Sequence, residues 1–254
     1  MKNLINWKLF FILLIACIIV SMLVIPYSLA LASSEIQFTV QIFLLTVAQN
    51  SVLFAIVVFF GLFFSKRIGM GLPIVQGILE GKNRAKEIKS ILAPSISLGV
   101  LSGIAIVVIN IPFTQLLPDL NMLDVSAPAW KALLASFYGG IAEEILLRLF
   151  LVSLFVWITF IIRKGKDGGP AVVGIWLSIV LAAVFFGLGH LPATAQITPL
   201  TGLVVVRAVV LNGIAGVVFG WLYWKKGLES AIIAHFSADI VLHIVTPFIM
   251  SLFL

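Results

Sequence analysis

The sequence predicts an all-α membrane protein, a polytopic transmembrane helical bundle of seven to eight spans. Hydrophobic residues form 62% of the 254-residue chain, and its mean hydropathy is +1.23. Charged residues form only 10% of it, against about 25% of an average soluble domain. The apolar residues are gathered into runs of about 20 or more, the length that an α-helix needs to cross a bilayer. These observations exclude a soluble protein.

We expect three spans in the first half of the chain, residues 1–128. The first apolar run, residues 9–32, is longer than the core of a signal peptide, which is usually about 7–15 residues. We interpret it as a spanning helix, with a cleaved signal peptide as the alternative. The second and third spans are expected at residues 38–64 and 91–111. The connection between them is polar and basic, with Lys66, Arg67, Lys82, Arg84, Lys86 and Lys89.

The second half of the chain predicts four more spans. They are expected at about residues 130–162, 170–191, 200–224 and 228–254. The first two form an antiparallel hairpin around a short basic turn, residues 163–169. Pro247 interrupts the last run, so an eighth span after this proline stays an alternative to a bent end.

The distribution of charge predicts the orientation, because Lys and Arg favour cytoplasmic loops. With the N-terminus in the cytoplasm, all of the 16 Lys and Arg lie in cytoplasmic segments except Lys131, Arg148 and Arg207. The loops on the other side have no Lys or Arg, and their acidic residues are Glu35, Asp119 and Asp124. We therefore expect a multi-pass protein of the cell membrane with a cytoplasmic N-terminus. The net charge of +6 follows from this topology, so no nucleic-acid partner is expected.

Three ionisable residues lie in the middle of the fourth span: Glu143, Glu144 and Arg148. Charged side chains are costly in lipid, so residues of this kind face a polar interior and are commonly functional. In a regular helix Glu144 and Arg148 lie one turn apart on the same face and can form an ion pair. Glu143 is rotated by about 100° from Glu144 and lacks that partner. The sequence therefore leaves Glu143 as the carboxylate for chemistry.

Histidines are the second group of candidate site residues. The chain has three, His190, His235 and His243, all in or at the edge of apolar runs. His235, Asp239 and His243 follow one another at i+4 steps and share one helix face. Measured from the tryptophans near the cytoplasmic ends of their helices, Glu143 and His190 are both about 21 Å deep, so we expect them to be neighbours. His235 is about 10 Å deep on a straight helix, and a tilt, a kink or a re-entrant start must close the gap.

Small residues recur on the sixth span. Asn212, Gly216 and Gly220 lie at i+4 intervals, and ridges of this kind let helix backbones approach closely in lipid. We interpret the glycines as packing residues and Asn212 as an interhelical contact, with a site role as its alternative. Arg207, on the same helix, is interpreted as a snorkelling or structurally paired side chain.

Four motifs stand in order along the second half of the chain. They are Glu143-Glu144-x-x-x-Arg148, Phe186-x-x-x-His190, Asn212…Gly216…Gly220 and His235-x-x-x-Asp239. Together they resemble the CAAX protease and bacteriocin-processing family (CPBP or Abi), whose best-studied branch is the Ras-converting CAAX prenyl endopeptidase. The resemblance covers about residues 130–245. It implies an intramembrane protease with a CAAX protease-like catalytic core in residues 129–254, preceded by transmembrane helices and a cytoplasmic basic loop in residues 1–128.

The resemblance also implies roles by matched position. Glu143 would be the general base that activates water, with His190 as its partner. Glu144 and Arg148 would hold the helix and tune its charge. A carboxylate held among apolar groups is suited to taking a proton and returning it.

His235 and Asp239 match the positions that stabilise the tetrahedral oxyanion in the family. The prenyl endopeptidase branch has Asn at the position of Asp239. An ionised Asp cannot donate a hydrogen bond to an oxyanion. Asp239 must therefore be protonated, orient His235, or bind something else.

A zinc mechanism is an alternative within the same resemblance. Zinc accepts nitrogen and oxygen ligands, and the ligands would be Glu143, His190, His235 and Asp239. The chain has no HExxH motif, and Glu143 cannot be both a ligand and a free base. We therefore favour water activated by the Glu143 and His190 side chains, without a cofactor.

Two further interpretations of these residues involve no catalysis. The ionisable residues of the fourth span could form a buried ion pair that only fixes packing. The protein could also be a bacteriocin-immunity or regulatory membrane protein that binds peptides without cutting them. The intact set of motifs favours the protease. Its expected partners are membrane lipids and a peptide or protein substrate that enters from the bilayer.

Overall fold

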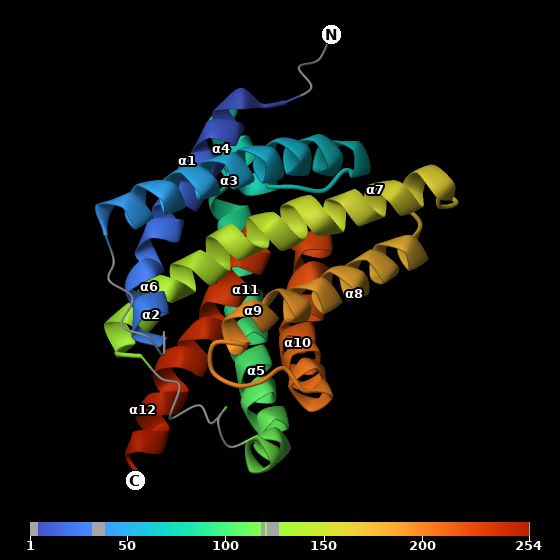
Figure 1. Cartoon of the computed structure of the whole chain (residues 1–254). Helices are drawn as coiled ribbons and strands as arrows, with labels where there is room; N and C mark the ends of the chain where they lie inside the picture. The colour runs from blue at the N-terminus through green and yellow to red at the C-terminus, as the bar shows by residue number, and fades with distance from the viewer. Residues whose placement is uncertain (1–4, 32–38, 118–119, 121–126, 254) are drawn as a thin grey trace.

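The computed structural model describes residues 5–31, 39–117, 120 and 127–253. Within them, seven helical stretches are long and apolar enough to cross a membrane (Figure 1). These are Trp7–Leu31, Val40–Ile68, Ala85–Leu116, Ala129–Ile162, Val172–Thr194, Gly202–Lys226 and Leu228–Ser251. The described part of the chain has helices and no strand. The prediction of an all-α polytopic bundle is therefore confirmed, with seven spans and no eighth after Pro247 in the described residues.

Five helices precede the fourth span. They are α1 (Trp7–Leu23), α2 (Ile25–Leu31), α3 (Val40–Ile68), α4 (Pro73–Leu79) and α5 (Ala85–Leu116). Four of them build the first three spans, and α4 lies in the connection between the second and third. The side chain of Asn6 caps α1 by accepting a hydrogen bond from the Leu9 N–H at 3.2 Å. α3 ends at Gly69, whose φ of 72° is left-handed and suits glycine. The acidic residues of the predicted outer loops, Glu35, Asp119 and Asp124, lie outside the described residues.

The polar connection between the second and third spans contains more helix than the sequence predicts. It contains α4, and both neighbouring helices extend past their apolar runs. The helices continue because polar side chains such as Lys66 and Lys86 can follow a helix out of the lipid. The apolar run thus marks the part of a helix inside the membrane, not the length of the helix.

The second half of the chain alternates α-helical with π-helical segments. In order these are α6 (Ala129–Tyr138), η2 (Gly139–Glu143), η3 (Ile145–Val152), α7 (Ser153–Ile162), α8 (Val172–Gly189), α9 (Leu191–Thr194), α10 (Gly202–Lys226), α11 (Leu228–Ile240), η4 (Val241–Val245) and α12 (Thr246–Ser251). The fourth span is thus a continuous helix with a π-helical middle, and α12 prolongs the last span.

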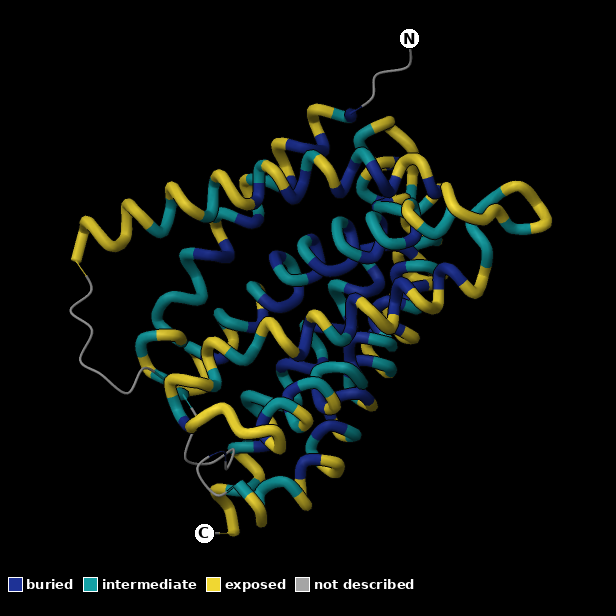
Figure 2. The backbone as a smooth tube through the Cα atoms, turned by 45° about the vertical axis from the view of Figure 1, so that its right-hand side comes forward, coloured by how far each residue is buried: buried dark blue, intermediate teal, exposed yellow. Residues whose placement is uncertain are grey.

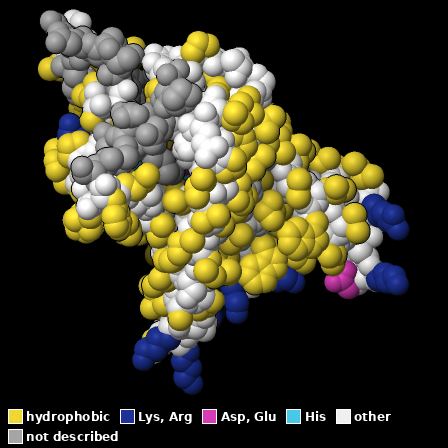
Figure 3. Space-filling view, turned by 90° about the horizontal axis from the view of Figure 1, so that it is seen from below, with side chains coloured by type: hydrophobic (Ala, Val, Ile, Leu, Met, Phe, Trp, Pro, Cys, Tyr) yellow, Lys and Arg dark blue, Asp and Glu magenta, His cyan; other side chains and the backbone are white. Residues whose placement is uncertain are grey.

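One hydrophobic core joins both halves of the chain. Leu9, Val58, Ile145 and Phe219 all belong to the same buried cluster. Figure 2 shows the buried positions on the inward sides of the helices and many exposed positions on their outer sides. On the face seen in Figure 3, the described surface is mostly hydrophobic side chains, with Lys and Arg gathered at its edges. This is the surface expected of a protein that lies in lipid.

The small-residue ridge on α10 packs against α8, as predicted. A Cβ atom on Gly216 would lie 2.7 Å from the Ala183 Cβ, and one on Gly220 would lie 2.7 Å from the Ile179 Cγ2. From the α8 side, a Cβ on Gly187 would lie 2.5 Å from the Val209 Cα. The two backbones therefore meet closely only because these positions carry no side chain.

Two polar residues of α10, Arg207 and Asn212, make structural contacts. Arg207 on α10 donates from Nε to the Asn110 Oδ1 on α5 at 2.9 Å, which confirms the structurally paired reading of Arg207. The Asn212 amide donates to the Ala208 carbonyl one turn earlier on its own helix, at 2.9 Å.

Replacing Gly187 by Ala tests the close contact between α8 and α10. The added methyl meets backbone atoms that cannot rotate away, so we expect the free energy of unfolding to fall by about 1–3 kcal/mol. Thermal unfolding of the purified protein in detergent measures this change. Gly213→Ala is the matched control, because a Cβ there meets nothing within 4 Å. Equal stability of the two variants would contradict the packing described for α8.

Candidate active site

A buried array of charged side chains crosses the middle of the bundle. Arg148 Nη1 donates to Glu144 Oε1 at 2.7 Å. The same oxygen lies 2.7 Å from His235 Nδ1 on α11. Since a carboxylate oxygen only accepts, Nδ1 must carry the proton. Glu144 is fully buried and Arg148 is 1% exposed, so Glu144 binds an imidazole and a guanidinium at once.

Aromatic rings and one backbone carbonyl complete the surroundings of this array. The Arg148 guanidinium carbon lies 5.2 Å from the Phe186 ring centroid and 5.4 Å from that of Phe219, both within cation–π range. Its Nη2 donates to the Gly216 carbonyl at 3.1 Å. Phe219 also stacks on the His235 ring at 4.9 Å. The predicted pair of Glu144 and Arg148 is therefore confirmed, and it fixes the position of an imidazole on another helix.

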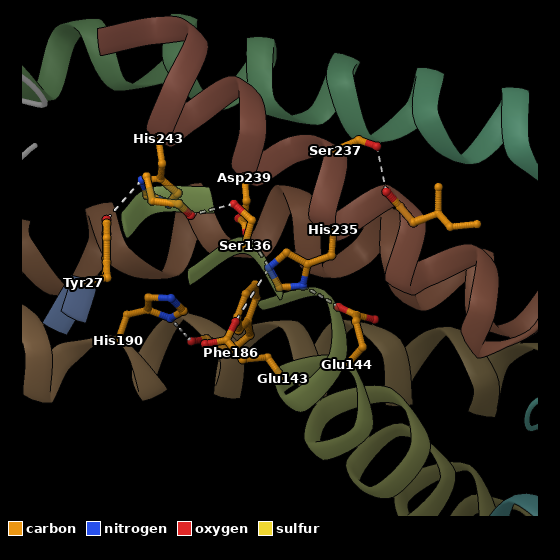
Figure 4. Close-up of polar contacts among 12 residues, drawn as sticks. Tyr27, Ser136, Glu143, Glu144, Phe186, His190, His235, Ser237, Asp239 and His243 are labelled. Carbon is orange, nitrogen blue, oxygen red and sulfur yellow. Dashed lines mark hydrogen bonds and ion pairs between the residues drawn. The ribbon is translucent and has the colours of Figure 1, made fainter. Parts of the chain in front are cut away.

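The other nitrogen of His235 faces two more carboxylates. Nε2 lies 3.7 Å from Glu143 Oε2 and 3.6 Å from Asp239 Oδ1. These separations are longer than direct hydrogen bonds but within the range of ion pairs with a protonated imidazole. The Glu143 side chain is 24% exposed, whereas that of Glu144 is fully buried. Figure 4 shows His235 between Asp239 on its own helix and the two glutamates.

Glu143 ends one π-helical segment and Glu144 links it to the next, so the prediction of a regular α-helix is wrong here. η2 ends at Glu143 and η3 begins at Ile145. A π-helix bonds i to i+5 and has a wider turn, which reduces the rotation between neighbouring side chains. Both glutamates therefore reach the same imidazole, one at each nitrogen. π-helical turns inside α-helices are frequent at functional sites.

Two glycines that the sequence analysis did not single out allow η2 and α11 to meet. A Cβ on Gly139 would overlap the Asp239 carboxylate and would lie 3.1 Å from His235 Nε2. A Cβ on Gly140 would lie 3.2 Å from the Ile232 carbonyl oxygen on α11. The sequence signal was the Gly-Gly pair that two residues separate from the acidic motif.

His235, not His190, is the imidazole that meets the glutamates. The expected depth difference between His235 and Glu143 is wrong, because these side chains lie in contact range. His190, at the C-terminal end of α8, has its Nδ1 2.9 Å from the Phe186 carbonyl oxygen. No hydrogen bond or ion pair joins His190 to Glu143 in the described part of the chain. The Phe186 ring contacts both imidazoles, at 4.9 Å for His190 and 5.6 Å for His235.

His243 contacts a residue from the other half of the chain. Its Nδ1 lies 3.3 Å from the hydroxyl of Tyr27 on α2, and the two rings meet edge to face at 5.8 Å. Tyr27 was not among the predicted site residues, because nothing in its local sequence marks it. The first span therefore reaches the polar interior (Figure 4).

The proposed zinc ligands do not form a metal site in this structure. Among the described residues, no group of three or more His, Cys, Asp and Glu side chains could hold a metal ion. His235 Nδ1 is bound to Glu144, and His190 Nδ1 is bound to a carbonyl. Glu143 and Asp239 face His235 Nε2 at 3.7 and 3.6 Å, whereas no hydrogen bond or ion pair joins His190 to these three residues in the described part of the chain.

Comparison with known proteins agrees with the motifs. Residues 125–241 match the family model described as type II CAAX prenyl endopeptidase Rce1-like. The match contains all six predicted site residues: Glu143, Glu144, Arg148, His190, His235 and Asp239. No curated protein and no solved structure matches the chain. The resemblance predicted from the sequence is therefore confirmed, and at the level of the family it indicates a membrane protease.

Replacing Arg148 by Met tests the buried array. The change leaves Glu144 without its guanidinium partner, so we expect the free energy of unfolding to fall by about 3–5 kcal/mol. The double variant with Glu144→Gln should regain part of this loss, because it removes the uncompensated charge. Thermal unfolding in detergent compares the two variants. Stability losses that simply add would show that these side chains do not form a pair.

Proposed function

We propose, from the match of residues 125–241 to the Rce1-like endopeptidases, that this protein is an intramembrane endopeptidase. Its substrate would be a membrane-embedded or lipidated peptide segment that enters the site from the bilayer. The site residues lie within spans, which supports a substrate that does not leave the membrane. We further propose the cell membrane as its location, with the N-terminus in the cytoplasm, on the charge distribution alone.

The observation that carries the mechanism is the placement of Glu143 opposite His235 Nε2. Glu143 is the partly exposed carboxylate of the pair and is free of the arginine that binds Glu144. In the proposed reaction, Glu143 takes a proton from a water molecule, and the oxygen of that water attacks the scissile carbonyl. Glu143 then returns the proton to the leaving amine, so the water is divided between the two products.

His235 would stabilise the negative oxygen that forms during the attack. Its Nδ1–H is held by Glu144, which fixes the ring and favours the charged imidazolium when Nε2 is also protonated. An Nε2–H directed at the developing oxyanion lowers the barrier. Asp239, 3.6 Å from Nε2, would orient and stabilise this imidazolium. This role needs no hydrogen-bond donor on Asp239.

His190 keeps a proposed role through its contact with Phe186. Because the Phe186 carbonyl accepts from Nδ1, the neutral ring presents Nε2 as an acceptor. An acceptor at this place can orient a water molecule or a substrate N–H. The Phe186 ring contacts both histidines, which supports their action at one site.

Replacing Glu143 by Gln is expected to lower the cleavage rate by at least about a hundredfold, since a general base contributes on the order of 10²–10⁴. The assay uses a prenylated reporter peptide with the purified protein in lipid vesicles. Glu80→Gln is the control, because Glu80 is exposed and pairs with Lys82 and Gln76 at the surface. Cleavage at the wild-type rate by a folded Glu143→Gln variant contradicts the proposed base.

Chelation separates the proposed mechanism from the zinc alternative. We expect the cleavage rate to stay within about twofold after incubation with a strong chelator, because no group of three or more His, Cys, Asp and Glu side chains among the described residues could hold a metal ion. Elemental analysis of the same sample measures the bound metal. A rate that falls with the metal content and returns on addition of zinc would favour the metalloprotease.

A further inference from the structure

A basic cavity lies at one end of the bundle, away from the candidate active site. Its volume is about 580 Å³. It is bordered by the ends of α3 and α10, the start of α5, and the loop that contains α4. These helix ends are also ends of membrane spans. The cavity therefore lies where the hydrocarbon region gives way to water.

The charges around this cavity have one predominant sign. Four basic residues line it, Lys66, Arg84, Lys225 and Lys226, with Glu87 as the acidic member. Arg84 Nη1 pairs with Glu87 Oε1 at 2.6 Å, so Lys225 and Lys226 give the cavity an excess of positive charge. Basic pockets between transmembrane helices attract anionic lipid headgroups.

Hydrogen bonds within the chain hold one wall of the cavity in place without a bound ligand. Glu229 Oε1 accepts from the N–H groups of Ile74 and Val75, both at 2.9 Å, and so holds the first turn of α4. The Leu228 N–H donates to the Gly71 carbonyl at 2.9 Å. The loop from α3 to α4 is thereby tied to the start of α11, and the cavity needs no rearrangement to exist.

A second contact fixes the basic side of the cavity. A Cβ on Gly77 would overlap the Arg84 guanidinium, so Arg84 lies flat on α4 only because residue 77 is glycine. The Lys225 ammonium lies 3.5 Å from the Trp224 ring centroid. The positive groups are therefore held at the cavity by packing.

We propose that this cavity binds the phosphate of an anionic phospholipid headgroup. Its position at the span ends matches the depth of that phosphate in a bilayer. Its apolar lining, which includes Leu72, Ile91 and Trp224, suits the glycerol and upper acyl carbons next to the phosphate. A free phosphate ion would contact the basic side chains of the cavity but not these apolar side chains. The proposal does not depend on the proteolytic activity.

Native mass spectrometry of the full chain in detergent tests this site. The protein is titrated separately with phosphatidylglycerol, phosphatidylcholine of the same chain length, and soluble glycerol phosphate. We expect phosphatidylglycerol to bind at least about tenfold more tightly than either of the others. In the Lys225→Gln, Lys226→Gln variant this preference should disappear, since each lysine removed lowers it by about fivefold.

The matched control is Lys86→Gln, Lys89→Gln, which removes the same charge at the same end of the bundle. Lys86 and Lys89 are exposed on α5 and do not line the cavity, so the preference for phosphatidylglycerol should persist. An equal loss in both variants would show a diffuse charge effect and overturn the site. Equal binding of both lipids by the wild type, or binding of glycerol phosphate as tight as that of phosphatidylglycerol, would overturn the proposal as well.

Discussion

The carboxylate of Glu144 is the constraint on which the centre of this protein depends. A charged carboxylate in the middle of a transmembrane bundle is tolerable only when it is paired and hydrogen-bonded. Here one oxygen binds both Arg148 and His235. The arginine in turn binds the Gly216 carbonyl and lies over two aromatic rings. Three helical segments are therefore joined by a single ionised group.

This interaction explains why small residues surround the site. The array can close only if α11 approaches η2 and α10 approaches α8, and side chains at Gly139 or Gly216 would prevent this. The same closeness turns His235 Nε2 toward Glu143 and Asp239. The buried charge of Glu144 thus positions the His235 imidazole opposite Glu143, a second and more exposed carboxylate. Structure and proposed chemistry depend on the same contacts.

The spans and the motif residues could be predicted because they depend on local information. Apolar runs predict membrane helices, and i+4 spacing predicts the pair of Glu144 and Arg148. The π-helical turn around Glu143 could not be predicted, because its hydrogen-bond register is decided by packing against α11. The place of His235 was missed for a related reason: depth along a straight helix does not describe how two helices cross. The contact of Tyr27 with His243 joins residues 216 positions apart, and no local pattern marks it.

A double-mutant cycle on the cleavage rate tests most directly whether Glu144 acts through His235. Glu144→Gln, His235→Gln and the double variant are compared with the wild type under single-turnover conditions, with each rate corrected for the folded fraction. If the two residues act as a unit, the double variant loses little more activity than the more damaged single variant. Losses that multiply would show that they act independently. That result would contradict a catalytic imidazole held by a buried carboxylate.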